Sequence, residues 1–183
     1  MNKKIAALIA VMTVAGCCFV GCQPKNEKKK IESIKVTNQD NEKYEAALIE
    51  CFDAMQSVGG GEVFYSYMYP DETIEAMKES GEYSKLVKTF NETQDRMIGS
   101  KSEKYTFGTV TEEKTLSEKQ IEGIKTYLVQ LSEPYLSTLT EDKLDVGEGY
   151  EVTYDYSKNG QNKESETIII FKLNDEGWKV ITK

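Results

Sequence analysis

The segment 150-YEVTYDYSKNGQNKESETIIIFKLNDEGWKVI-181 decides the fold. Its first part, Tyr150 to Tyr156, alternates large ring or aliphatic side chains with polar ones, as in a strand with one buried face. Asn159-Gly160 predicts a tight hairpin turn. The return segment Thr167–Leu173 is apolar almost throughout, which predicts a central strand covered on both sides. A turn at Asn174–Gly177 then leads into a last strand from Trp178, so these residues predict a three-stranded antiparallel meander.

Helical periodicity dominates the sequence before the meander. Apolar residues recur every three or four positions between Asn41 and Ser57, and again after Asp71 and after Tyr83. This spacing predicts three amphipathic helices. The triplet Gly59-Gly60-Gly61 is interpreted as the break that ends the first of them, because no lysine and hydroxyl residue follow it as they would in a phosphate-binding loop.

One strand and one more helix complete the expected elements. From Lys104 the apolar spacing shortens to two, which predicts a strand. A fourth helix is expected to begin after Ser117, because Ser117 and Gln120 have the spacing of a capping box. We therefore expect an α+β fold in which N-terminal helices pack on a curved antiparallel sheet of about four strands.

The N-terminus has the pattern of an export signal. Lys3 and Lys4 precede an uncharged run from Ile5 to Val20, which is shorter than the roughly 20 residues that a bilayer span requires. Within it, Val14-Ala15-Gly16-Cys17 resembles the lipobox of bacterial lipoproteins, and a second candidate ends at Cys22. The resemblance implies that one of these cysteines is acylated with diacylglycerol, of the palmitate type, and becomes the first residue of the mature chain.

Either Cys17 or Cys22 can be the lipidation site, and the sequence favours Cys17. Val14 is the usual kind of residue three positions before the cysteine, whereas Phe19 is not. The polar segment after Cys22 is nevertheless the tether expected beyond an anchor. The expected organisation is a signal and anchor region over residues 1–22, a polar Lys-rich tether over 23–40 and a single domain over 41–183.

A second resemblance concerns the domain. Helices, one strand, a helix and a meander that ends in Gly177-Trp178-Lys179-Val180 resemble the cystatin-like or nuclear-transport-factor-2-like fold, and in particular small gut-bacterial lipoproteins of unknown function. The resemblance covers about residues 40–183. It implies a sheet curved around helices to form a cone with a pocket, dimerisation through the sheet in many members, and functions that include dehydratases, isomerases and non-catalytic binding domains.

Composition excludes many functions. The 183 residues include no histidine, which removes histidine-based triads, dyads and zinc sites. The net charge of −8 argues against a nucleic-acid partner. We expect no metal and no cofactor, because carboxylates such as Asp142, Asp145 and Glu148 lack the alternation of a calcium-binding loop. Cys51, the one cysteine outside the signal region, is expected to be buried on the first helix.

Aromatic residues supply the candidates for ligand binding. A pocket or patch for a sugar, a peptide or an apolar molecule is expected from their amphipathic rings, and the alternative is that the rings fill the seam between helices and sheet. The candidates are Tyr65, Tyr67, Tyr150, Tyr154, Tyr156 and Trp178. No catalytic residue is expected, since Asp53 and Asp155, the possible bases for an Asp/Tyr site, belong to polar faces of their elements.

The sequence thus predicts a lipoprotein held at the cell membrane, on its extracytoplasmic face, by an acylated N-terminal cysteine. Its domain is expected to be a non-catalytic module that binds a small ligand or a cell-surface protein. The alternatives are a dehydratase- or isomerase-type enzyme with an Asp/Tyr pocket, and a structural surface protein that forms a homodimer.

Overall fold

The computed structural model describes residues 43–101 and 104–182, which belong to one compact unit, Val36–Lys183. The predictions for Cys17, Cys22 and the tether lie outside the described residues. The helices are α2 (Tyr44–Met55), α3 (Gly61–Met68), α4 (Asp71–Glu79), α5 (Glu82–Lys101) and α6 (Glu118–Ser132), with a short 3-10 turn, η1 (Glu141–Lys143). The strands are β1 (Tyr105–Thr115), β2 (Val146–Lys158), β3 (Gln161–Leu173) and β4 (Trp178–Thr182).

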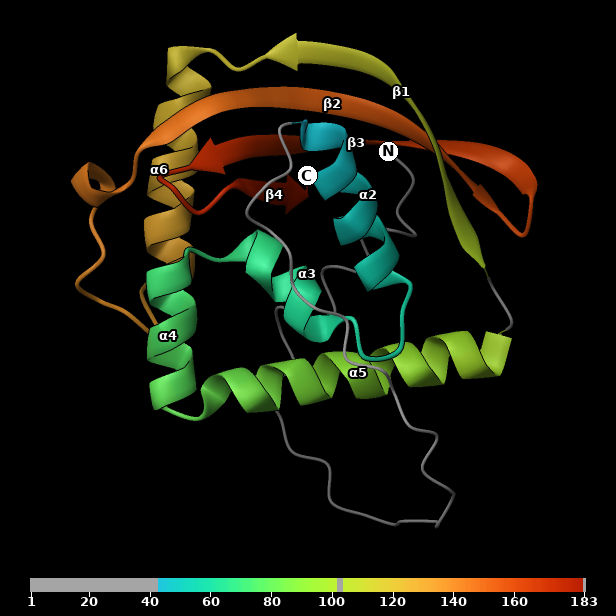
Figure 1. Cartoon of the computed structure of the whole chain (residues 1–183), viewed down its shortest axis with the longest axis horizontal. Coiled ribbons are helices and arrows are strands. Elements are labelled where there is room, and N and C mark those ends of the chain that lie inside the picture. Colours follow the sequence, from blue (N-terminus) through green and yellow to red (C-terminus); the bar gives the residue numbers. More distant parts are fainter. Residues whose placement is uncertain (1–42, 102–103, 183) are drawn as a thin grey trace. The chain divides into compact units, whose positions relative to one another are not determined.

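The four strands form one open antiparallel sheet in the order β1-β2-β3-β4. In Figure 1 this curved sheet arches over α2 and α3, and α5 runs below α3. The expected α+β class, with helices packed on a curved antiparallel sheet, is therefore confirmed.

The helix α2 forms where the three- and four-residue spacing predicts it. Ala47, Leu48, Cys51 and Phe52 are buried on its inner side. Burial confirms the expected position of Cys51, and loss of solvation raises the pKa of its thiol to about 12. The thiol is therefore neutral and unreactive near pH 7.

The helix α3 was not predicted. Gly59, at φ +92°, makes the turn after α2 as expected, but Gly61 already belongs to α3. A Cβ on Gly60 would lie 2.1 Å from the Ala54 carbonyl oxygen, so the chain turns too tightly here for a side chain. Because α3 is enclosed by α2, α5 and β4, nearly all of its sides are apolar, and its helical period is hidden in the sequence.

The helix α6 begins as its sequence predicts. The Gln120 side-chain oxygen accepts a hydrogen bond from the Ser117 backbone N–H at 3.0 Å, as a capping box requires. Ile124 and Leu128 then pack against Phe171 and Leu173 of β3. This helix therefore covers one face of the end of the sheet.

The strand β3 is buried on both sides in its second half, as predicted. Ile170 and Phe171 are adjacent, so they point to opposite faces of the sheet, and both are 0% exposed. Phe171 packs below α6, whereas Ile170 shares its face with Tyr154, whose ring meets Phe52 of α2 at 5.9 Å between centroids. Helices on both faces explain the nearly continuous apolar run of this strand.

The β2–β3 hairpin turns at Asn159-Gly160, both with positive φ, as predicted. Lys158 pairs with Gln161, but Ser157 pairs with Lys163, so one extra residue, Asn162, is inserted in β3. This bulge shifts the pairing by one position. Every β3 side chain beyond it therefore lies on the opposite face from the one that an unbroken two-residue hairpin would give it.

A buried lysine ties the edge strand β4 to the helices. Lys179 is 2% exposed, and its ammonium donates to the carbonyl oxygens of Ser66 at 3.0 Å and Tyr69 at 2.9 Å. It also meets the Asp71 carboxylate at 2.9 Å and the Glu176 carboxylate at 3.0 Å. The ammonium thus links β4 to the junction between α3 and α4.

Candidate functional site

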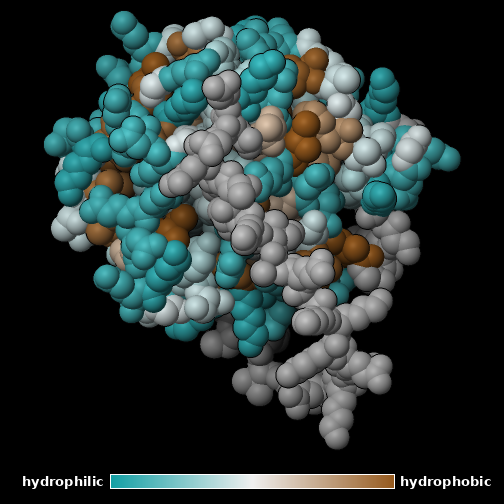
Figure 2. Space-filling view, viewed as in Figure 1, coloured by the Kyte–Doolittle hydropathy of each residue, from teal (hydrophilic) through white to brown (hydrophobic). Residues whose placement is uncertain are grey.

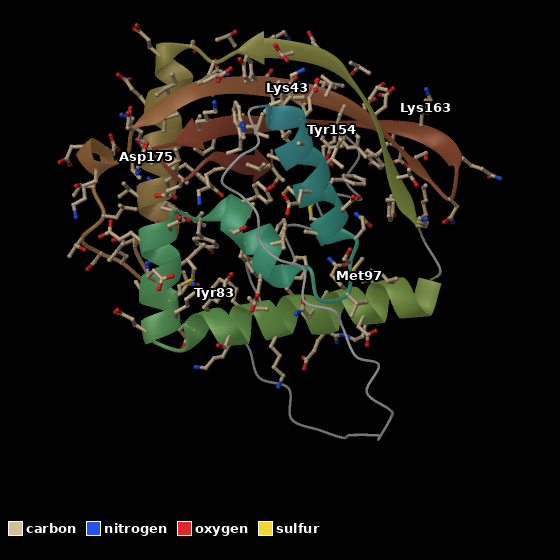
Figure 3. All side chains as sticks on the ribbon, viewed as in Figure 1. Lys43, Tyr83, Met97, Tyr154, Lys163 and Asp175 are labelled. Carbon is tan, nitrogen blue, oxygen red and sulfur yellow. The ribbon has the colours of Figure 1, made fainter. Side chains whose placement is uncertain are left out.

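Aromatic rings gather on the sheet face that α2 covers. We name Phe52, Tyr105, Phe107, Tyr154 and Tyr156 the sheet cluster. Phe107 stacks on Tyr154 at 5.0 Å between ring centroids, and Phe52 meets Phe107 edge-on at 5.6 Å. Tyr156 completes the set through contacts with Phe52 and Tyr105 at 6.2 and 6.1 Å. Figure 3 shows Tyr154 next to α2 and the sheet.

The buried tyrosines of this face donate their hydroxyl protons to glutamates. Tyr154 donates to Glu166 at 3.3 Å, Tyr156 to Glu164 at 2.9 Å. Burial raises the pKa of both phenols, and the neighbouring carboxylates raise it further. These hydroxyls are therefore neutral, and their protons already have an acceptor.

The carboxyl group of Glu166 is partly buried in this network. Loss of solvation raises its pKa, although the hydrogen bond from Tyr154 acts in the opposite direction. A carboxyl group of this kind can hold a proton above the usual pH range of glutamate, which is one requirement of a general acid. The Glu166 carboxyl group, however, already accepts a hydrogen bond from the Tyr154 hydroxyl.

A second set of rings lies where α2 begins. We name Tyr44, Tyr150 and Trp178 the edge cluster; their ring centroids are 5.1 to 6.3 Å apart. Tyr44 donates to Glu113 and Tyr150 to Glu148, and this second bond raises the Tyr150 pKa to about 12. The Lys172 ammonium lies 4.9 Å from the centre of the Trp178 ring.

A third set fills the space between α3, α5 and the end of α6. We name Phe64, Tyr65, Tyr69, Phe90 and Tyr135 the helix cluster. Phe64 stacks on Phe90 at 4.9 Å, Tyr65 meets Phe90 at 5.6 Å, and Tyr69 meets both Tyr65 and Tyr135 at 6.2 Å. Burial raises the Tyr65 pKa to about 12, and the hydroxyls of Tyr135 and Tyr83 contribute to the shift.

The six predicted ligand-binding residues do not line one site. Tyr154 and Tyr156 belong to the sheet cluster, Tyr150 and Trp178 to the edge cluster, and Tyr65 to the helix cluster. Tyr67 stands outside these ring contacts and donates to Glu50 at 2.7 Å. All but Tyr150 are buried, so most of these rings fill the seam between helices and sheet, as the alternative interpretation expected.

The two aspartates considered as bases lie away from the aromatic clusters. The Asp155 carboxylate accepts from the Ser165 hydroxyl at 2.8 Å, on the sheet face opposite Tyr154. Asp53 is exposed on α2. Both positions agree with the polar faces expected from the sequence.

Sequence reasoning missed the residues that accompany the tyrosines. Glu164 and Glu166 reach the sheet cluster only because the bulge shifts β3 by one position, and local periodicity carries no signal for that shift. Tyr127 and Tyr135 reach the neighbourhood of Tyr69 because α6 ends there. The apolar stripe of α6 indicated where that helix packs but not which rings it would meet.

Polar and charged residues cover most of the face seen in Figure 2, with apolar residues in separate spots. Within residues 43–101 and 104–182, no group of three or more cysteine, aspartate and glutamate side chains is placed to hold a metal ion. Among the helices of the described part, none combines the length and the apolar character needed to cross a bilayer. No protein-family model matches the chain, and neither a curated protein nor a solved structure matches it.

Proposed function

We propose that this protein is a lipoprotein anchored on the extracytoplasmic face of the cell membrane, and that its α+β domain is a non-catalytic binding module. The observation that carries the anchoring is the sequence Val14-Ala15-Gly16-Cys17, placed after two lysines and within an uncharged run. Acyl chains on Cys17 or Cys22 would hold the chain at the bilayer surface.

Charge supports a domain held away from that surface. Residues 43–182 contain 27 aspartates and glutamates against 15 lysines and arginines, a net charge of −12. A domain this acidic is repelled by anionic headgroups. The tether between the anchor and α2, which contains Lys25 and Lys28–Lys30, gives the domain the reach to meet partners outside the membrane.

The chemistry of the aromatic clusters supports binding rather than catalysis. In the sheet and edge clusters, Tyr44, Tyr150, Tyr154 and Tyr156 each donate to a glutamate. A phenol that stabilises a developing oxyanion must instead direct its proton at the substrate. In the described part of the chain, Glu166 favours the dehydratase- or isomerase-type alternative, because its pKa is raised, but its carboxyl group already accepts a hydrogen bond from Tyr154.

Mass spectrometry of the chain purified from membranes of its own host tests the anchoring. We expect a mature N-terminus at Cys17 or Cys22 that carries the mass of a diacylglycerol. The variants Cys17→Ser and Cys22→Ser identify the site, because only one of them should abolish lipidation. Recovery of the chain without lipid and with an intact signal would overturn the proposal.

Sedimentation of the same material tests the homodimer alternative. A monomer at micromolar concentration would count against a structural role through sheet pairing, whereas a stable dimer would support it. The binding module requires neither state.

A further inference from the structure

Tyrosines from several elements gather between α3, the start of α5 and the end of α6. Tyr65 and Tyr69 come from α3 and the residue after it, Tyr83 from α5, and Tyr127 and Tyr135 from α6 and the turn that follows it. The hydroxyls of Tyr135, Tyr65 and Tyr127 all act on Tyr69, whose pKa is raised by burial first and by these neighbours next. The ring centroids of Tyr65 and Tyr69 are 6.2 Å apart, as are those of Tyr69 and Tyr135, so these phenols are neighbours.

The five side chains differ in how far they are exposed to solvent. Tyr65, Tyr69 and Tyr83 are 7 to 9% exposed, Tyr135 is half-buried and Tyr127 is 37% exposed. The first three therefore form the floor of the group and the last two its rim. Figure 3 shows Tyr83 near the junction of α4 and α5.

The tyrosines of this group differ from those on the sheet in their hydrogen bonds. Tyr83 donates to the Glu62 carbonyl at 3.3 Å. Among the described residues, by contrast, none provides a hydrogen bond to the hydroxyls of Tyr65, Tyr69 or Tyr135. Buried polar groups are nearly always paired in folded proteins, so unpaired hydroxyls on two neighbouring tyrosines that are only 7 and 9% exposed, Tyr65 and Tyr69, indicate a ligand.

The chemistry of the group selects the class of ligand. A neutral phenol both donates and accepts, and its ring offers an apolar wall. No carboxylate accepts a proton from Tyr65, Tyr69 or Tyr135 in the described part of the chain, and the nearest ammonium with a ring contact, that of Lys78, lies over Tyr83. Such a surface suits a molecule with several hydroxyl groups and no charge.

We propose that Tyr65, Tyr69, Tyr127 and Tyr135 form a binding site for a neutral saccharide. This inference rests on the proposed binding function and names its ligand class. The deep hydroxyls of Tyr65 and Tyr69 bind sugar hydroxyls, and the rings of Tyr127 and Tyr135 contact the sugar at the rim.

The test uses the full chain, purified from membranes in a detergent without a sugar headgroup. Saturation-transfer difference NMR measures binding of D-glucose, D-galactose, D-mannose and N-acetyl-D-glucosamine. We expect saturable binding of at least one of them. The variants Tyr69→Phe and Tyr135→Phe keep the rings and remove one hydroxyl each, and each should weaken that binding about three- to tenfold.

Two further variants keep the test decisive. Tyr127→Phe changes a rim side chain that is 37% exposed, so we expect it to leave the fold intact, and it should also weaken binding. Tyr105→Phe, in the sheet cluster, should leave sugar binding unchanged. No saturable binding of any of the four sugars would overturn the inference, as would binding that all three site variants retain.

The remaining outcomes separate this inference from the anchoring. Binding of tetramethylammonium in place of the sugars would overturn the neutral ligand in favour of a cation held by the rings. A chain that carries lipid but binds no sugar would reject the ligand class and leave the anchoring intact. A chain that binds sugar but carries no lipid would do the reverse.

Discussion

Two regions of this domain bury tyrosines in different ways. On the sheet, Tyr154 and Tyr156 lie opposite Glu166 and Glu164, and each phenol donates to the glutamate that its strand partner provides. Between the helices, Tyr65 and Tyr69 meet other rings, and within residues 43–101 and 104–182 no carboxylate accepts from their hydroxyls. The same residue type therefore has a carboxylate acceptor in one region, whereas Tyr65 and Tyr69 in the other have none within the described residues.

The difference follows from secondary structure. Antiparallel strands place side chains in register across the sheet, so one glutamate per tyrosine is provided by pairing alone. Helices that cross bring rings together by packing, so an acceptor is present only where a facing side chain provides one, as Glu50 of α2 does for Tyr67 of α3. The acceptors of Tyr154 and Tyr156 are therefore set by strand register, whereas those of helix tyrosines depend on which side chains the crossing helices present.

The largest loss of stability is expected from a substitution that breaks the link between the sheet and the helices at Lys179. Lys179→Met removes the ammonium that joins β4 to the carbonyls of Ser66 and Tyr69, and it leaves the largely buried Glu176 carboxylate without its cation, while the Asp71 backbone N–H still donates to it. Urea unfolding should show a loss of roughly 3–5 kcal/mol. Lys78→Met, which breaks an exposed pair with Glu75, is the control and should cost less than about 1 kcal/mol. Equal costs for the two variants would contradict this role of Lys179.

The next effect concerns the engaged phenol of the sheet. Tyr154→Phe leaves the partly buried Glu166 without its donor, and it should cost about 1.5–3 kcal/mol in the free energy of unfolding. Urea unfolding at pH 7 measures it. A cost near zero would mean that the hydrogen bond at 3.3 Å contributes nothing, and the two regions would then not differ.

The hydrogen-bonded pair of Tyr154 and Glu166 should also make the stability of the domain depend on pH. Because the folded state raises the Glu166 pKa, it favours the protonated carboxyl group, and the resulting stabilisation is present below the ordinary glutamate pKa of about 4.3. That stabilisation is lost as the pH rises through the raised value. The stability of the wild type relative to Glu166→Gln should therefore decline from pH 4 towards pH 7. Parallel unfolding curves for the two proteins across this range would refute the shift.

The smallest effect is expected at the available phenol. Tyr69→Phe removes a hydroxyl that makes no hydrogen bond within the described residues, so the free energy of unfolding should change by less than about 0.5 kcal/mol. Denaturant unfolding without added sugar measures this. A loss as large as that of Tyr154→Phe would show that the hydroxyl is engaged within the protein, and the comparison would fail.

Much of the fold could be predicted from local patterns. The Asn159-Gly160 turn, the capping box at Ser117 and the apolar run Thr167–Leu173 each reflect an interaction within a few residues or within one element, and each appears where it was expected. The helix α3 was missed because it is apolar on nearly every side, so its sequence has no polar stripe to define a period.

The candidate sites could be predicted only in part. The aromatic residues were identified, but their division into three clusters depends on which helix crosses which strand. The positions of Glu164 and Glu166 depend on the bulge at Asn162, because without it the strand after the turn would present its other face to α2.

The sequence by itself determined the order of the elements, the hairpin, the acidic balance and the absence of histidine, because these depend on neighbouring residues or on composition. Only the tertiary structure decided which tyrosine hydroxyls donate to a carboxylate and which tyrosines pack against other rings. Register and helix crossing are set by packing between residues far apart in the chain, and the phenols of Tyr154 and Tyr69 differ for that reason alone.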